Sequence, residues 1–304
     1  MAIPPHQVTP TQPSRGQSLA ILATAMIVLQ LVASICYPIA KYGLGVIEPF
    51  TFAFFRYLIS STVLLTIVSF TKRQPKIERR DWGRIVLLGV LIIPFNQTLF
   101  LVGQNLTGAG HGAFIFSTTP VWIFILAVVH LKERATWRRT TGIVMATAGV
   151  MTIMLSGAIA IGTEYLLGDL IILISVLAWA YYTILGKKLV QKYGALRMTA
   201  YALAIGSAMY LPLGGWFALK YDYSQATLAA WGSVVYMAIG LSVIVYVLWY
   251  WLLKYLEASQ IAVYHNVQPV IASALAYFFL GEAVGPAFIV GGVVILAGVI
   301  ITEV

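Results

Sequence analysis

The chain has 304 residues, of which 60% are hydrophobic and 10% are charged. A soluble domain carries about 25% charged residues, because polar groups must cover its surface, so the composition excludes an ordinary soluble protein. The net charge of +9 would fit a nucleic-acid-binding protein, but the basic residues gather in loops between apolar runs, and no nucleic-acid partner is expected.

Residues 1–18 are rich in Pro and Gln, contain Arg15 as their only charged residue, and are predicted to form a disordered cytoplasmic tail. The run at 19–40 has no charge and is long enough to cross a bilayer. It contains Cys36, the single cysteine of the chain, so no internal disulfide can form. With one Cys and four scattered His residues, we expect neither a metal site nor a cofactor.

Apolar runs divided by charges, Gly or Pro predict an all-α membrane protein with ten membrane-spanning helices. The runs are uniformly apolar, whereas the strands of a membrane barrel would alternate. The first five runs, at 19–40, 50–70, 85–105, 111–130 and 140–156, form a predicted repeat over 19–156. The other five, at 169–186, 198–219, 231–253, 258–280 and 284–302, form a second repeat over 157–304.

The basic residues orient these helices, because cytoplasmic loops carry an excess of Lys and Arg. With a cytoplasmic N-terminus, every Lys and Arg except Lys41, Arg56 and Lys220 falls in the tail or in a cytoplasmic loop. The sequence therefore predicts a multi-pass protein of the bacterial inner membrane, with both termini in the cytoplasm. The basic loops would face anionic lipid head groups.

Two stretches of the chain are similar to each other. Residues 117–133 read STTPVWIFILAVVHLKE and residues 266–282 read NVQPVIASALAYFFLGE. An offset of 149 positions relates Pro120 to Pro269, Glu133 to Glu282, Gly142 to Gly291, and Gly149 to Gly298. Such self-similarity indicates a duplication, although two helices rich in Leu and Ala also share identities by chance. Because five helices is an odd number, the second copy would insert upside down, giving the inverted repeats of many transporters.

Four short motifs of the sequence resemble those of one protein family. The LKE after the fourth run, the LGE after the ninth, FFRYLIS at 54–60 and WAYYTILGKKL at 179–189 resemble the EamA family of the drug/metabolite transporter superfamily. The resemblance covers about residues 19–302. It implies ten helices, cytoplasmic termini, and movement of small metabolites, often amino acids or related solutes. One departure is GEAVGPAF at 281–288, where a basic residue commonly follows the Glu.

The same resemblance implies where a solute would bind. It places a central cavity mainly between the first, third, fourth, sixth, eighth and ninth helices. The fifth and tenth helices would lie at the periphery or in a dimer contact, so a monomer or a homodimer is expected. The implied partners are a small-molecule solute and the lipid bilayer.

Pro120 and Pro269 lie near the middle of the fourth and ninth runs. Each removes an amide donor and frees the carbonyl four residues earlier, on Phe116 and His265. In hydrocarbon such carbonyls need a partner or must line a wet cavity, and matched helix breaks predict a transporter site and its gating. The alternative is a packing kink that a neighbouring Ser or Thr fills.

Polar and aromatic side chains within the runs are the candidate solute ligands. Buried amides and imidazoles are costly unless paired, and the polar set is Gln30, Asn96, Gln97, Ser117, His265, Asn266 and Gln268. The aromatic set is Tyr37, Phe100, Trp179, Tyr182, Tyr246 and Tyr250. The alternatives are hydrogen bonds between helices for the polar set and packing seams or interfacial anchors for the aromatic set.

Arg56 lies about six residues into the second run, where its stem could snorkel to the outer interface, and a structural role is favoured over contact with solute. No Asp or Glu lies in the middle of a predicted span, which argues against a buried carboxylate proton relay.

These observations predict a transporter that exports small polar or amphipathic metabolites, amino acids or related solutes, by alternating access. A multidrug or toxic-compound exporter is the alternative. A membrane enzyme is less favoured, because the chain contains no GxSxG, no HExxH and no acidic cluster.

Overall fold

The computed structural model describes residues 19–71, 76–107, 112, 115–155, 163–268, 270–271 and 286–303, and every regular element within them is helical. Six of these helices are long and apolar enough to cross a membrane. Two shorter apolar helices accompany them, at Ile115–Leu131 and Pro286–Thr302. The predicted all-α membrane class is therefore confirmed.

The first three crossings follow the predicted runs closely. They consist of α1 (Leu19–Leu44), α2 (Pro49–Phe70), and a third crossing built from α3 (Arg79–Val90), the π-helical segment η1 (Leu91–Thr98) and α4 (Leu99–Leu106). Glu48 begins α2, since its carboxylate accepts hydrogen bonds from the amides of Phe50 (2.9 Å) and Thr51 (2.7 Å). These bonds satisfy donors that a helix start leaves free.

The fourth and fifth helices of the predicted first repeat are shorter. The segment α6 (Thr119–Leu126) continues into the π-helical segment η2 (Ala127–Leu131), and α7 (Trp137–Leu155) follows. Lys132 ends η2 in a left-handed conformation with φ 59°. This backbone reversal turns the chain into the loop that carries Glu133.

The second half of the chain begins with α8 (Leu166–Tyr193) and α9 (Ala195–Lys220). They are followed by a long apolar helix built from α10 (Leu228–Tyr236), the π-helical segment η5 (Met237–Val245) and α11 (Tyr246–Tyr255). Then come α12 (Ala258–Val263), the 3₁₀ segment η6 (Tyr264–Val267) and α14 (Pro286–Glu303). Pro269 and residues 272–280 of the predicted ninth span, together with Glu282 after it, lie outside the described residues.

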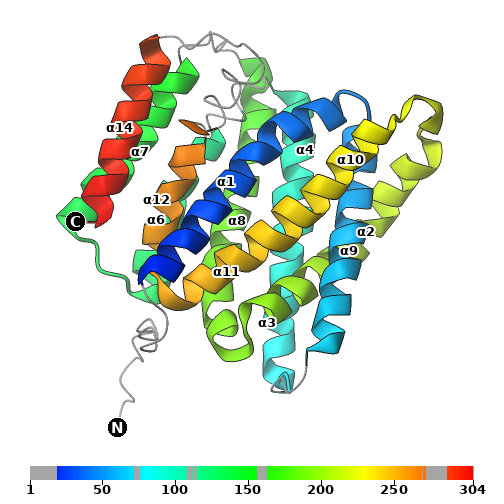
Figure 1. Cartoon of the computed structure of the whole chain (residues 1–304), viewed down its shortest axis with the longest axis horizontal. Helices are drawn as coiled ribbons and strands as arrows, with labels where there is room; N and C mark the ends of the chain where they lie inside the picture. Colours follow the sequence, from blue (N-terminus) through cyan, green and yellow to red (C-terminus); the bar gives the residue numbers. More distant parts are fainter. Residues whose placement is uncertain are drawn as a thin grey trace.

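The helices form one bundle, with α7 and α14 side by side at its edge (Figure 1). In the interior, α2 packs on α9, α4 packs on α8, and α1 packs on α10 and η5. One large apolar core joins these helices, and it includes the aromatic side chains of Trp179, Tyr182 and Trp249. A smaller apolar cluster joins α7 and α14 to α12.

Glycines set the distance between α7 and α14. A Cβ atom on Gly149 would lie 2.6 Å from the carbonyl oxygen of Gly291, and one on Gly298 would lie 2.6 Å from that of Gly142. The residue numbers rise along one helix as they fall along the other, so the two helices are antiparallel. Backbones this close leave no room for a side chain, which is why small residues gather where membrane helices pack.

Glu133 links the two halves at the end of the bundle where the basic loops lie. Its carboxylate pairs with Lys187 Nζ of α8 at 3.1 Å, and the two side chains are 5% and 2% exposed. It also accepts hydrogen bonds from the amide of Ala258 (2.8 Å) and the hydroxyl of Ser259 (2.7 Å) at the start of α12. Burial opposes ionisation of Glu133, but Lys187 and these hydrogen bonds outweigh it and hold its pKa below the ordinary value.

We expect Gly291→Ala to lower the melting temperature of the purified protein. Its methyl group would meet the Gly149 carbonyl oxygen at 2.6 Å and the Ile153 side chain at 2.5 Å, and overpacking of this kind costs about 1–3 kcal/mol. Gly292→Ala is the matched control, because its nearest contact would be Val270 at 3.8 Å, an ordinary separation. Equal melting temperatures for the two variants would contradict the close packing.

We expect Glu133→Gln to destabilise the protein by about 3–5 kcal/mol, because it leaves the buried Lys187 without a counter-charge. An acid whose pKa is lowered by folding stabilises the folded state at any pH above its pKa in the unfolded chain, which is 4.5 here. This stabilisation is lost as the pH falls through the pKa of the folded state. Melting temperatures recorded from pH 7 to pH 3 should therefore show an acid-dependent loss that the variant lacks.

The control for this experiment is Glu78→Gln, because the carboxylate of Glu78 is 44% exposed. Exposed ion pairs contribute about 0–1 kcal/mol. If the Glu133 and Glu78 variants had the same melting temperature at pH 7, the buried ion pair would not stabilise the fold.

Candidate functional site

Two π-helical segments interrupt long apolar helices. η1 lies between α3 and α4 and contains Pro94, which cannot donate a backbone hydrogen bond, and η5 lies between α10 and α11. Moved by the 149-residue offset, η1 would cover 240–247, which overlaps η5. Single π-helical interruptions of α-helices recur at functional sites, and interrupted membrane helices expose backbone groups that can bind solutes.

Arg56 of α2 lies between these two segments. Its Nε donates to the hydroxyl of Ser242 in η5 at 2.9 Å, and its Nη1 reaches Oε1 of Gln97 in η1 at 3.5 Å. The side chain is 7% exposed, with Tyr57 and Tyr246 beside it. The expectation that Arg56 snorkels to the interface is wrong, because the two segments offer it hydrogen-bond acceptors inside the bundle.

An amide network extends from this point toward α8. Gln97 accepts a hydrogen bond from the Tyr57 hydroxyl at 3.1 Å and donates to the side-chain oxygen of Asn96. Asn96 is fully buried and donates to the backbone carbonyl of Ser175 at 2.9 Å. The two predicted amides of the third crossing therefore connect α2, η1 and α8.

A second polar group joins the first helix to the ninth. The amide of Gln268 donates to the side-chain oxygen of Gln30 at 2.9 Å, and Asn266 is buried close by in η6. This contact brings together predicted residues that are 238 positions apart in the chain. Gln30 and Gln268 therefore hydrogen-bond to each other between helices, which is the alternative to solute binding that the sequence predicts for the polar set.

Aromatic rings fill the space between the two polar groups. Trp179 is central, with ring centroids 5.5 Å from Tyr182, 5.4 Å from Tyr246 and 6.3 Å from His265. Tyr182 stacks on Tyr250 at 4.7 Å. Because Tyr246 lies beside Arg56 and His265 precedes Asn266, the rings form a continuous layer from one polar group to the other.

Several buried polar atoms in this region have no hydrogen-bond partner. They include Arg56 Nη2, Trp179 Nε1, the Tyr182 hydroxyl, His265 Nε2 and Asn266 Nδ2. More than 90% of buried polar groups in folded proteins have a partner, and exceptions call for an explanation. Four of these five residues belong to the set predicted from the sequence.

The remaining predicted residues lie elsewhere or are only partly described. Phe100 packs edge-to-face on Phe116 at 5.4 Å, and Ser117 is half-buried beside it in the chain. Pro120 lies in the first turn of α6, and the carbonyl of Phe116 that it frees accepts a hydrogen bond from the Thr119 hydroxyl. The freed carbonyl is therefore paired with a neighbouring Thr, as the alternative of a packing kink predicts. The side chain of Tyr37 and all of Pro269 lie outside the described residues.

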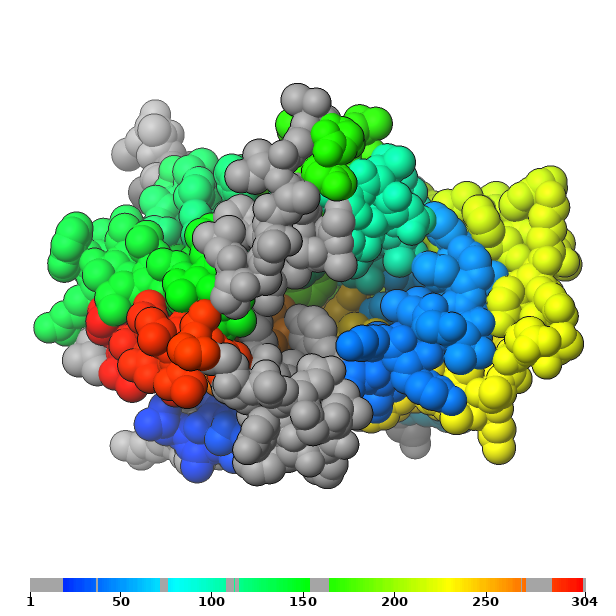
Figure 2. Space-filling model, turned by 90° about the horizontal axis from the view of Figure 1, so that it is seen from above, coloured from blue at the N-terminus to red at the C-terminus, as the bar shows by residue number. Residues whose placement is uncertain are grey.

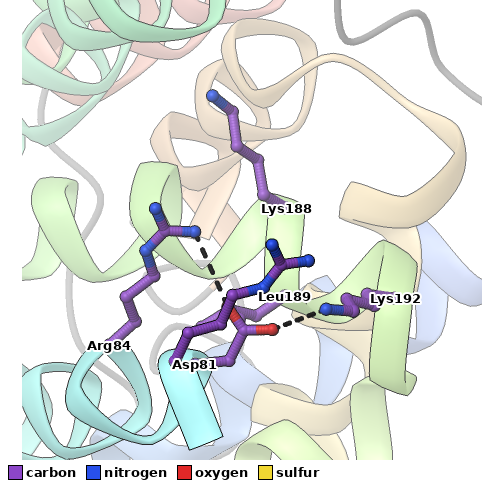
Figure 3. A pocket seen from close by; sticks show the side chains of 6 residues that line it. Asp81, Arg84, Lys188, Leu189 and Lys192 are labelled. Atoms are coloured by element: carbon purple, nitrogen blue, oxygen red, sulfur yellow. Dashed lines mark hydrogen bonds and ion pairs between the residues drawn. The ribbon is translucent and has the colours of Figure 1, made fainter. Parts of the chain in front are cut away.

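A pocket at the basic end is separate from these residues. It has a volume of about 340 Å³ and is lined by Arg80, Asp81, Arg84, Lys188, Leu189 and Lys192. Figure 3 shows Lys192 and Arg84 pointing to Asp81, at 2.7 Å and 3.7 Å, while Lys188 points away. None of the predicted solute ligands lines this pocket.

The opposite face of the bundle is hollowed near its centre (Figure 2). The blue atoms of α2 and the cyan-green atoms around α4 border the hollow, and segments of the second half are visible deeper inside. Since α2 begins on this side and Arg56 lies about two turns into it, the hollow opens on the side nearest to Arg56.

Sequence reasoning missed two participants, Tyr57 and Ser242. The signal for Ser242 was its spacing, because it lies four residues before Tyr246 and therefore on the same helical face. Tyr57 follows Arg56 directly, within a motif that had been used only to recognise a family. An isolated arginine in an apolar run was itself the signal that its neighbours provide the partners.

Comparisons with known proteins agree with this picture. The model of the EamA-like transporter family matches residues 19–155 and 166–304. An "Uncharacterized transporter" of Archaeoglobus fulgidus is 28% identical over 265 residues, which is 86% of this chain and 90% of that protein. "Uncharacterized transporter YyaM" of Bacillus subtilis is 30% identical over 267 residues, 87% of each chain.

Two further matches add detail. A "Probable terminal-alkyne amino-acid exporter" of Streptantibioticus cattleyicolor is 29% identical over 229 residues, 75% of each chain. A solved crystal structure aligns with a TM-score of 0.78 over 93% of this chain and 96% of that one, and its 17% identity shows a shared fold. Because the family model covers both halves and these sequence relatives are named as transporters or as an exporter, the chain is a membrane transporter that belongs to the EamA-like transporter family.

Proposed function

We propose that this transporter exports small polar or amphipathic metabolites, amino acids or related solutes among them, by alternating access. The observation that carries the proposal is that each half contributes an interrupted crossing to one polar centre. η1 offers Gln97 and η5 offers Ser242 to the same Arg56 side chain. A site shared by two halves can be opened to either side when the halves move against each other.

The proposed mechanism needs two five-helix halves, 19–156 and 157–304, inserted in opposite directions. The antiparallel packing of α7 on α14 supports this, because Gly142 meets Gly298 while Gly149 meets Gly291. Such reciprocal contacts, in which each position meets the counterpart of the other, are what a two-fold axis produces. The overlap of η1 with η5 under the same offset is a second, independent support.

The position of the basic loops supports an inner-membrane protein with both termini in the cytoplasm. The basic end is held together by two carboxylate–lysine contacts, the buried pair of Glu133 with Lys187 and the partly exposed pair of Asp81 with Lys192. The opposite face is hollowed (Figure 2). We therefore assign the structure to a state that is closed toward the cytoplasm and open toward the outside.

An amino acid or related solute is supported by the relative named as an amino-acid exporter. The layer of Trp and Tyr rings favours a second candidate, the export of larger amphipathic or toxic compounds, because aromatic walls accept apolar groups of many shapes. Among the described residues no Asp or Glu lies in the middle of a membrane span, which favours facilitated diffusion or exchange over a carboxylate proton relay.

We expect counterflow in proteoliposomes. Vesicles loaded with unlabelled solute should transiently accumulate the same solute in labelled form, because a carrier returns loaded more readily than empty. A panel of amino acids, nucleosides, sugars and amphipathic cations would separate the two candidate solute classes. A channel would equilibrate the label without accumulation, and that outcome would contradict alternating access.

Asn266→Ala should reduce counterflow about tenfold or more, since it removes a buried amide whose donor nitrogen is free for a solute. Its melting temperature should stay close to that of the wild type, because no partner is lost. Asn105→Ala is the matched control, on an exposed residue at the end of α4. Unchanged counterflow in the Asn266 variant would remove this residue from the solute site.

A further inference from the structure

Arg56 carries a charge that no carboxylate in the described part of the chain neutralises. A guanidinium stays protonated at every physiological pH. The ion pairs among the described residues do not include it. The groups that act on it electrostatically are the hydroxyls of Tyr57 and Tyr246 and the thiol of Cys36, and the Tyr246 hydroxyl also lies within hydrogen-bonding reach of the guanidinium. An uncompensated charge buried among helices is costly, so this arrangement calls for an anion.

The guanidinium also has free hydrogen-bonding capacity. Ser242 occupies Nε, whereas Nη1 makes only a long contact of 3.5 Å to Gln97. The same Gln97 oxygen already accepts from the Tyr57 hydroxyl at 3.1 Å. Nη2 is buried and has no partner. The two terminal nitrogens form a planar fork, which matches the two oxygens of a carboxylate.

The neighbouring side chains add donors and few acceptors. The side-chain oxygens of Asn96, Gln97 and Gln30 already accept hydrogen bonds. The donors Trp179 Nε1 and Asn266 Nδ2 are buried without partners. A solute that satisfies this region must therefore bring acceptor oxygens.

The charge of the solute follows from the asymmetry of the two halves. The position 149 residues after Arg56 is Ile205, an apolar residue of α9 that packs against the main core. The described centre thus holds one arginine rather than a symmetric pair. One cation balances one negative charge, which fits a carboxylate and leaves a phosphate dianion half-compensated.

We propose that Arg56 binds the carboxylate of the transported solute, and that the aromatic rings of Trp179 and Tyr246 contact its apolar part. This inference rests on the proposed transport function, and it adds the chemical class of the solute. Tyr57 and Ser242 act as positioning residues, because they orient the guanidinium or its partner Gln97 without needing to touch the solute.

The test compares acids with their own amides on the purified wild-type protein. The probes are 3-phenylpropionate with 3-phenylpropionamide, and L-phenylalanine with L-phenylalaninamide. Binding is followed by quenching of tryptophan fluorescence, since Trp179 and Trp249 lie in the ring layer. Each acid should bind about tenfold to a hundredfold more tightly than its amide, the gain of a charge-assisted hydrogen bond.

Variants locate the preference at Arg56. Arg56→Gln should abolish the difference between acid and amide, and Arg56→Lys should retain part of it, because the charge remains while the fork is lost. Arg84→Gln is the matched control, on an arginine with a 69% exposed side chain at the opposite end of the bundle. It should keep the full preference of the wild type.

Equal affinity of acid and amide for the wild type, including binding of neither, overturns the inference even if the Arg56 variants do not fold. Counterflow of neutral solutes without any preference for acids leaves the transport function standing and removes the carboxylate site. Acid-selective binding without counterflow would support the carboxylate site at Arg56 and contradict the proposed transport function.

Discussion

The structure depends on the requirement that a polar group inside a membrane bundle finds a partner. Water is not available there, and an unpaired charge or amide costs several kcal/mol. Arg56 meets this requirement only in part, since Ser242 and Gln97 leave Nη2 without an acceptor. Both of its partners come from π-helical segments. The same interruptions that break the regular backbone therefore hold the charge, and the incomplete pairing leaves Nη2 able to donate a hydrogen bond to an acceptor.

The periphery meets a different requirement, that of close apolar contact. Lipid is as apolar as leucine, so membrane helices associate through packing and not through the hydrophobic effect. Glycines in α7 and α14 bring the two backbones together in two reciprocal contacts. This pair of helices can therefore act as a rigid support, while the interrupted crossings carry the polar groups. Close packing at the edge and interrupted helices at the centre thus have different structural roles, and this arrangement fits the proposed movement of one half against the other.

Much of this arrangement was predictable from the sequence, and the reasons for success and failure are physical. Uncharged runs marked the helices because hydrocarbon excludes charge. His265 and Asn266 were candidates because polar atoms in such runs need partners, and Trp179 was a candidate as an aromatic wall of the pocket. The direction of the Arg56 side chain was not predictable, since snorkelling and inward pairing both satisfy an isolated arginine. The outcome depended on Ser242, 186 positions away in the chain. The π-helical segment around Pro94 was not predicted, because its formation depends on packing between helices.

The two ends of the bundle complete the physical argument. At the basic end, Glu133 and Lys187 compensate each other fully, with additional hydrogen bonds to the start of α12 and to the Leu256 carbonyl. At the centre, Arg56 has no such counter-charge among the described residues. The Glu133 contacts join the loop after η2 to α8 and α12, so separating α12 from this loop must break the hydrogen bonds from Ala258 and Ser259 to the Glu133 carboxylate. In the proposed transport cycle, a solute that compensates Arg56 relieves the cost at the centre, and that gain in free energy offsets the loss of these hydrogen bonds. Binding at one place can thus be coupled to opening at the other through the helices that connect them.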